Sequence, residues 1–180
     1  PFREDAPVGC QTSPYAAAKL AGELFCRTYS HLYGIKAVCL RYFTVYGPRQ
    51  RPDMAIHKFI RAIDEGAELC IFGDGTSSRD YTFVDDAVDG TVAALYLQSD
   101  FEIINIGNSR AVNILDLVAA ISRILGKEAR ITFIGNQLGD VSSTCADISK
   151  AASLLGYTPK TPLEEGLMEQ IKYMRCHAVN

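Results

Sequence analysis

The sequence predicts an α/β fold, and two patterns in it carry that prediction. Segments with helical periodicity alternate along the chain with short apolar segments of strand length. One apolar segment, Ala37-Val38-Cys39-Leu40, is continuous, as in parallel strands that are buried on both faces. The 180 residues, 48% of them apolar, provide enough material for one ordinary domain or a large part of one.

The first predicted helix runs from Ser13 to about Tyr33. Ser13 is a good N-cap, Pro14 suits the first helical turn, and Gly34 is a plausible C-terminal cap. The elements expected next are a strand at 35–43, a loop at 46–53, a helix at 55–65, a strand at 68–72 and a turn-rich loop at 73–78.

The alternation continues in the second half of the chain. Asp85 is expected to cap a helix that ends near Leu97, and Asn113 is expected to cap a helix that stops at Gly126. The other elements are predicted as strands at 81–84, 101–106 and 129–134, and as helices at 148–155 and 162–175.

Composition limits the partners that this chain could have. The 18 basic and 21 acidic residues give a formal net charge of -3, and no segment carries a block of Lys and Arg, which argues against nucleic acid or a membrane surface. No apolar run approaches the roughly 20 residues that cross a bilayer. The opening residues, Pro1-Phe2-Arg3-Glu4-Asp5, do not resemble a signal peptide, so a cytoplasmic location is expected.

The cysteines and histidines predict no metal site. The 6 cysteines include no C-x-x-C pair, and the 3 histidines have no metal-ligand spacing with them. We expect reduced thiols in the core or on the surface.

The first helix carries the chemistry that is easiest to interpret. Tyr15 and Lys19 are four residues apart and therefore share one face of the helix. The ammonium of Lys19 favours the phenolate form of Tyr15, which would make the phenol a usable proton acceptor. Taken alone, such a pair is more often a half-buried Tyr beside a solvated Lys.

Two longer runs of sequence favour the catalytic interpretation of Tyr15 and Lys19. The helix resembles the active-site helix of extended short-chain dehydrogenases/reductases, specifically the NAD-dependent nucleotide-sugar epimerases and dehydratases, in the run Pro14-Tyr15-Ala16-Ala17-Ala18-Lys19-Leu20-Ala21-Gly22-Glu23. The second run looks most like UDP-glucuronate 4-epimerases: Leu40-Arg41-Tyr42-Phe43-Thr44-Val45-Tyr46-Gly47-Pro48-Arg49-Gln50-Arg51-Pro52-Asp53-Met54-Ala55.

The second run implies a site at the end of the predicted strand 35–43. Strand ends at the carboxyl edge of an α/β sheet bind ligands, and guanidinium groups suit carboxylate and phosphate. The resemblance implies that Thr44 and Arg51 face the carboxylate of the sugar, whereas UDP-glucose 4-epimerases typically have Asn in place of Thr44. It also implies that NAD is bound by Tyr15, Lys19, Tyr42 and Phe43. Without the resemblance, Arg49 and Arg51 would be taken as solvated loop residues.

Further resemblances extend the substrate site. Arg79, in a run similar to the family's substrate domain, matches the position that meets the UDP pyrophosphate; the alternative is an ion pair with Asp80 or Asp74. Gln137 and Asp140 resemble an R-x-G-D-type ribose and phosphate clamp, with Gln in place of the more common Arg. Two positions match a uridine-contacting segment, although their helix is otherwise more typical of core: Lys58 and Phe59.

The parent reaction that the resemblance implies is a reversible 4-epimerisation of a UDP-sugar. Tyr15 would remove the proton of the 4-hydroxyl while the C4 hydride passes to NAD, and both would return to the opposite face of the 4-keto sugar. Lys19 would tune Tyr15 and contact the nicotinamide ribose.

The glycine-rich strand–turn–helix that holds the NAD pyrophosphate is missing, since the chain contains no G-x-x-G-x-x-G run. We therefore expect the C-terminal part of an epimerase. Residues 1–50 would be a residual piece of the NAD-binding Rossmann domain and residues 51–180 mainly the UDP-sugar-binding domain, with some segments returning to the Rossmann sheet.

The isolated chain is expected to be inactive. The alternatives are a non-catalytic fragment that binds UDP-sugars or associates with itself, for example as a homodimer, and a relative that is a UDP-glucose 4-epimerase, decarboxylase or dehydratase.

Overall fold

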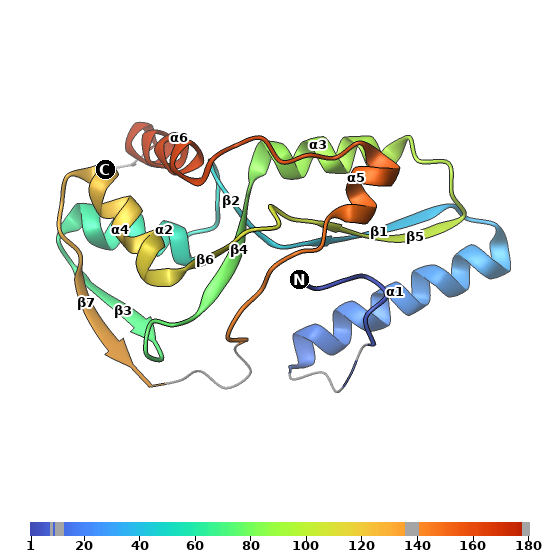
Figure 1. Ribbon diagram of the computed structural model, residues 1–180, viewed down its shortest axis with the longest axis horizontal. Coiled ribbons are helices and arrows are strands. Elements are labelled where there is room, and N and C mark those ends of the chain that lie inside the picture. The colour runs from blue at the N-terminus through green and yellow to red at the C-terminus, as the bar shows by residue number, and fades with distance from the viewer. Residues whose placement is uncertain (8, 10–12, 136–140, 178–180) are drawn as a thin grey trace.

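The computed structural model describes residues 1–7, 9, 13–135 and 141–177, and it is an α/β structure with parallel strand pairs (Figure 1). Its helices are α1 (Pro14–Tyr33), α2 (Ala55–Glu65), α3 (Val84–Leu95), α4 (Ile114–Leu125), α5 (Ser149–Leu155) and α6 (Leu163–Cys176). Its strands are β1 (Ala37–Tyr42), β2 (Thr44–Tyr46), β3 (Glu68–Phe72), β4 (Ser78–Phe83), β5 (Phe101–Ile106), β6 (Ala111–Asn113) and β7 (Arg130–Ile134).

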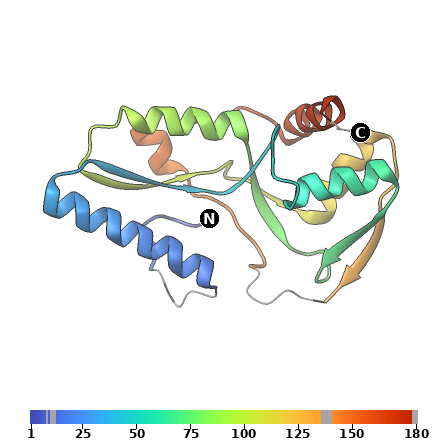
Figure 2. The ribbon, with the colours of Figure 1, turned by 180° about the vertical axis from the view of Figure 1, so that it is seen from behind.

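A helix–sheet–helix sandwich forms one end of the molecule. β1 pairs in parallel with β5, with Ala37 opposite Phe101 and Tyr42 opposite Ile106. Figures 1 and 2 show α1 on one face of this pair and α3 with α5 on the other. The core here includes Ile104 and Ile106, both fully buried.

Helix α1 forms where its end signals predict it. The hydroxyl of Ser13 accepts a hydrogen bond from the backbone N–H of Ala16 at 3.2 Å, and Gly34 ends the helix with a left-handed φ of 64°. Its inner face is tied to β1 by a two-pronged ion pair, in which Arg41 donates to both carboxylate oxygens of Glu23 at 2.7 Å. Such paired charge-assisted bonds fix orientation as well as distance.

The other end of the molecule has its own core. β3 pairs in parallel with β7, and α2, α4 and α6 pack beside this pair. The three-stranded sheet β2–β4–β6 lies between the two ends, with β2 parallel and β6 antiparallel to β4. The chain of β1 thus leaves one sheet at Tyr42 and joins another at Thr44.

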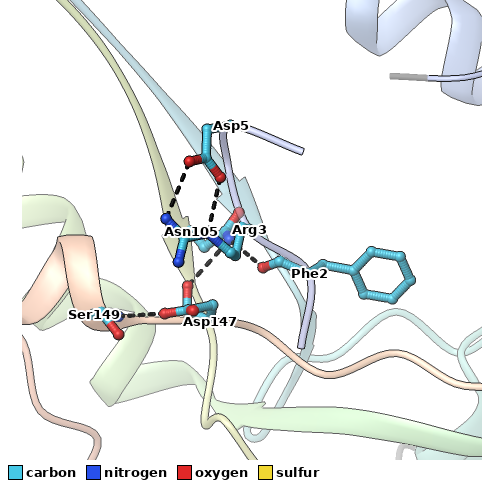
Figure 3. A network of polar contacts seen from close by, with 6 residues as sticks. All are labelled: Phe2, Arg3, Asp5, Asn105, Asp147 and Ser149. Atoms are coloured by element: carbon cyan, nitrogen blue, oxygen red, sulfur yellow. Dashed lines mark hydrogen bonds and ion pairs between the residues drawn. The ribbon is translucent and has the colours of Figure 1, made fainter. Parts of the chain in front are cut away.

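The N-terminal segment crosses the β5 edge and is held by buried Asn105 (Figure 3). The Asn105 side chain donates to the carbonyl oxygens of Phe2 at 2.9 Å and Asp147 at 3.1 Å, while its backbone N–H donates to Glu4 at 2.8 Å. This network joins residues that are far apart in the sequence.

Most predicted elements are confirmed to within about three residues, but some expectations are wrong. The sequence pattern does not predict β2 and β6, because three-residue strands are too short to show a periodicity. Strand β4 starts at Ser78 rather than at 81, and α3 ends at Leu95. Asp85 lies inside the first turn of α3 instead of capping it, where a carboxylate interacts favourably with the helix dipole. In the described part of the chain, no helix is both long and apolar enough to cross a membrane.

Candidate functional site

A pocket of about 500 Å³ opens where β1 ends and β2 begins. Parallel α/β sheets bind ligands where neighbouring strands diverge at their carboxyl ends, and β1 and β2 pair with different partners on either side of Phe43. The pocket is lined by Tyr15, Val84, Met54 and the run from Tyr42 to Arg51.

The pocket brings together residues from both predicted runs. Tyr15 comes from the first turn of α1, whereas Phe43, Thr44 and Arg51 come from the strand end and its loop. They meet because α1 packs along β1, so that the start of the helix lies near the end of the strand.

Tyr15 is 73% exposed, and its ring faces Lys19. The Lys19 ammonium lies 5.3 Å from the centroid of that ring, which is the side-by-side placement that four-residue spacing predicts. Lys19 itself does not line the pocket. The pair therefore presents a phenol to the pocket with a cation behind it.

The strand end is fixed from two sides. The Tyr42 hydroxyl lies 2.6 Å from the hydroxyl of Thr91 on α3, and the backbone N–H of Phe43 donates to Ile106 at 3.0 Å. At Gly107, next to this bond, a Cβ atom would lie 3.4 Å from the Phe43 ring and closer still to Ala146. The backbone that delivers Phe43 and Thr44 to the pocket is thus closely packed.

The loop after β2 has a fixed backbone and exposed arginines. The Gly47 N–H donates to the side-chain oxygen of Gln170 at 2.9 Å, and the Gln50 amide donates to the Val45 carbonyl at 3.0 Å. Arg51, with 74% of its side chain exposed, reaches Asp53 at 3.0 Å, a weak surface pair that an anion in the pocket could replace. Arg49 adopts a left-handed φ of 66°.

Sequence reasoning missed Gln170 and Gln50. Gln170 is 1% exposed, and its amide nitrogen donates to the Gln50 oxygen at 2.9 Å. That oxygen also accepts from the backbone of His57. A Gln on a helix 120 residues downstream carries no local signal for this role, because only the packing of α6 brings it to the loop.

Tyr46, another tyrosine in the pocket wall, is poorly suited to proton transfer. Burial raises its pKa, with the Asp86 carboxylate adding to the shift, and its hydroxyl donates to the Leu163 carbonyl at 3.2 Å. Burial also raises the pKa of neighbouring Tyr81 to about 12. These raised pKa values make the phenolate form, which a proton acceptor requires, harder to reach in both residues.

Arg79, Lys58 and Phe59, three of the predicted substrate residues, do not line this pocket. Arg79 donates to the carbonyl oxygens of Ser78 at 2.8 Å and Ser142 at 3.5 Å. Lys58 is exposed on α2, and the Phe59 side chain is in the core at 6% exposure. Gln137 and Asp140 lie outside the described residues. The roles of all five stay predictions.

Asp80, next to Arg79, is a fully buried carboxylate that joins three segments. It accepts hydrogen bonds from the backbone N–H groups of Asn108 at 2.7 Å, Ser109 at 2.9 Å and Ala146 at 2.9 Å. This explains how β4 is held to the chain that follows β5 and to the segment around Ala146. Among the described residues, no cluster of three or more His, Cys, Asp or Glu side chains could hold a metal ion.

A family model and a similar protein sequence both indicate an epimerase. The model of the NAD dependent epimerase/dehydratase family matches residues 1–107. The UDP-glucuronate 4-epimerase of Thermodesulfobacterium geofontis is 44% identical over 97% of this chain and 54% of its own length. The chain thus spans about half the length of this relative.

Solved structures agree in fold. A UDP-glucuronic acid 4-epimerase from Bacillus cereus, in complex with UDP-glucuronic acid and NAD, superposes with a TM-score of 0.91 at 44% identity, over 97% of this chain and 56% of its own. A UDP-glucose 4-epimerase from Thermus thermophilus, in complex with NAD, gives a TM-score of 0.91 at 28% identity, over 99% of this chain and 58% of its own.

Proposed function

Because the chain belongs to the NAD-dependent epimerase/dehydratase family, we propose that it supplies the catalytic helix and the substrate pocket of a UDP-sugar 4-epimerase. The preferred substrate is UDP-glucuronate, which would be converted to UDP-galacturonate. One observation carries the proposal: a single pocket is lined by the phenol of Tyr15, by Thr44 and by exposed Arg51.

The residues present fit one end of NAD. Tyr15, Tyr42 and Phe43 line the pocket at the strand end, where a nicotinamide ring could lie against aromatic side chains, and Lys19 is one helical turn from Tyr15. The chain contains no glycine-rich turn for the pyrophosphate. NAD, when bound, supplies an acceptor and donor of hydride.

In this proposal each side chain has a distinct task. The Tyr15 phenolate oxygen takes the proton of the sugar 4-hydroxyl and later returns it, with the charge of Lys19 favouring the phenolate form. Thr44 and Arg51 bind the sugar carboxylate, and Arg79 binds the pyrophosphate. The segment at Lys58 and Phe59 contacts uridine. Gln137 and Asp140 hold the ribose and the phosphates. Residues 1–50 belong to the cofactor domain and residues 51–180 mainly to the substrate domain.

The preference for a carboxylate can be tested by calorimetry. We expect UDP-glucuronate to bind this chain more tightly than UDP-glucose, and the change Arg51→Met to weaken UDP-glucuronate about tenfold, because it removes a charge-assisted hydrogen bond. UDP itself should bind the variant as it binds the parent. Arg61→Met is the matched control, because Arg61 is also an exposed arginine but lies on α2, outside the pocket. It should change neither the affinity for UDP-glucuronate nor that for UDP.

Two results would count against this proposal. If Arg51→Met and Arg61→Met weaken UDP-glucuronate binding equally, Arg51 does not bind the sugar carboxylate. That result would favour the alternative of a UDP-glucose 4-epimerase. No binding of UDP or of either UDP-sugar would reject the substrate pocket altogether.

We propose that these 180 residues alone do not epimerise. Hydride transfer needs a cofactor fixed within fractions of an ångström, and the chain lacks the turn that anchors its pyrophosphate. The test is incubation with NAD and UDP-glucuronate, followed by chromatography for UDP-galacturonate. Turnover would refute this part of the proposal.

Self-association is a second candidate property. The outward face of α1 leaves several large apolar side chains more than half exposed, namely Leu24, Phe25, Tyr29, Leu32 and Tyr33. Exposed apolar patches of this kind mark interaction surfaces, and a homodimer would cover them. Sedimentation velocity of the chain should give a dimer, and a monomer at all concentrations would refute this.

A further inference from the structure

Two cysteines face each other across the contact between α1 and β1. Cys26 is exposed on α1, and Cys39 is half-buried on β1. Neither belongs to the candidate pocket, and neither residue has a role in the proposed reaction.

The contacts on either side of the two cysteines fix their alignment. Glu23 and Ser30 lie on the same stripe of α1 as Cys26, because residues three, four and seven apart share a helix face. Glu23 binds Arg41 of β1 at 2.7 Å, and the Ser30 hydroxyl donates to the Asp100 carbonyl at 2.8 Å, just before β5. The stripe is therefore held against the sheet on both sides of Cys26.

The spacing along the two elements brings the cysteines opposite each other. Cys26 follows Glu23 by three residues on the helix, which is a rise of about 4.5 Å. Cys39 precedes Arg41 by two residues on the strand, which is a distance of about 6.6 Å. The helix and the strand run in opposite directions, since only residues 34–36 join them. A step forward along the helix and a step back along the strand therefore lead in the same direction, and both lead away from the Glu23–Arg41 pair. Cys39 and Arg41 also share a strand face.

The electrostatics of Cys39 agree with this geometry. Burial and, after it, contact with the Cys26 thiol raise the pKa of the Cys39 thiol to about 11, with Glu23 acting in the same direction and Arg41 against it. A protonated, half-buried thiol reacts slowly with a soluble oxidant. The exposed thiol of Cys26 is therefore the one that meets it first.

We propose that Cys26 and Cys39 form a thiol–disulfide site that is oxidised by small disulfides such as oxidised glutathione. In the first step the Cys26 sulfur attacks the glutathione disulfide, which forms a Cys26–glutathione bond and releases one glutathione thiol. In the second step the Cys39 sulfur attacks the Cys26 sulfur, which forms the Cys26–Cys39 bond and releases the second glutathione. The two cysteines lose two electrons, and their two protons end on the two glutathione thiols.

The product links the helix that carries Tyr15 and Lys19 to the strand that ends at Tyr42. The disulfide would close a short loop, and such a bond stabilises mainly by restricting the unfolded chain. The site stands independently of the proposed epimerase function, because it depends only on the packing of α1 on β1.

Peptide mapping of the oxidised chain tests the proposal. After incubation with oxidised glutathione and alkylation of the remaining thiols, trypsin without reductant should release residues 20–27 joined to residues 37–41, with the mass of the two peptides less two hydrogens. Reduction should separate them. The exposed cysteines Cys70 and Cys176 provide internal controls, and they should carry glutathione singly.

Three variants complete the test. Cys39→Ser should leave Cys26 carrying glutathione with no linked peptide, and Cys26→Ser should leave Cys39 unmodified. Cys70→Ser, the matched control, should form the linked peptide as the parent does. The proposal is overturned if the folded parent, checked by circular dichroism, takes glutathione on Cys70 and Cys176 but forms no 20–27/37–41 peptide. Pairing of Cys39 with any other cysteine would overturn it equally.

Discussion

Gln170 on α6 holds Gly47 at the edge of the pocket: the Gly47 N–H donates to the Gln170 side-chain oxygen at 2.9 Å, 123 residues away in the sequence. Both residues are buried. At Gly47, where φ is 135°, a Cβ atom would lie 2.8 Å from Val84, so the loop passes too close to α3 for a side chain. Helix α6 thus fixes the backbone of the loop after β2, which carries Arg49 and Arg51.

Replacing Gln170 by leucine should destabilise the protein by about 1–3 kcal/mol, because the Gly47 N–H would be left buried without an acceptor. The free energy of unfolding from urea titration measures this. The control is Glu169→Gln on the exposed side of the same helix, for which a change within about 0.5 kcal/mol is expected. Equal effects of the two changes would show that the Gly47 bond contributes nothing.

The Gln170 variant should also affect binding selectively. Because the amide acts on the loop that carries Arg51, we expect affinity for UDP-glucuronate to fall while affinity for UDP is retained. Calorimetry on folded Gln170→Leu measures both. A parallel loss of both affinities would indicate general disruption instead.

Asp80→Asn should cost about 2–4 kcal/mol of stability, since an amide cannot accept from all three backbone N–H groups that the carboxylate holds. Chemical denaturation of the variant measures the cost. Asp89→Asn is the matched control, because Asp89 is exposed on α3 with Lys160 only at 3.8 Å, and such pairs contribute little. A loss below that of the control would refute the anchoring role of Asp80.

Glycine to alanine changes should have opposite signs at two helical positions. At Gly166 on α6, a Cβ atom would collide with the Tyr46 hydroxyl and lie 2.7 Å from the Phe83 ring, so Gly166→Ala should destabilise by about 1–3 kcal/mol. At Gly22 on α1, nothing lies within 4 Å, and Gly22→Ala should stabilise by about 0.5–1 kcal/mol. Thermal unfolding of both variants checks the signs; a stabilising Gly166→Ala would contradict the close packing of α6.

Stability should depend on the charge of Asp64 at acidic pH. Hydrogen bonds from Lys127 at 2.7 Å and Arg175 at 3.1 Å lower the pKa of this carboxyl below its ordinary value. A lowered folded-state pKa contributes stability that is fully present above the unfolded value and is lost as the pH falls through the folded value. Because the group is about one-third exposed, the contribution should be at most about 1 kcal/mol.

The measurement is the free energy of unfolding of the parent and of Asp64→Asn between neutral pH and pH values below the ordinary carboxyl range. The parent should lose its advantage over the variant as the pH falls. A constant difference across that range would contradict the ion pairs at Asp64.

Local signals in the sequence predict most of the element order and place Tyr15 and Lys19 on one face of the first helix. End signals such as Ser13, Gly34, Asn113 and Gly126 are local, because a cap is made by residues within one turn, and the structure has each of them in that role. The spacing of Tyr15 and Lys19 likewise fixes their proximity through helix geometry alone.

Which distant residues lie together is a property of the folded chain. Gln170 reaches Gly47, and Asp80 reaches Ala146, because helices and strands pack in three dimensions, and no periodicity in the sequence encodes such partners. The short strands β2 and β6 also depend on β4 for their hydrogen bonds. The pocket also depends on how the strands pair in three dimensions, since it lies where β1 ends in one sheet and β2 begins in another.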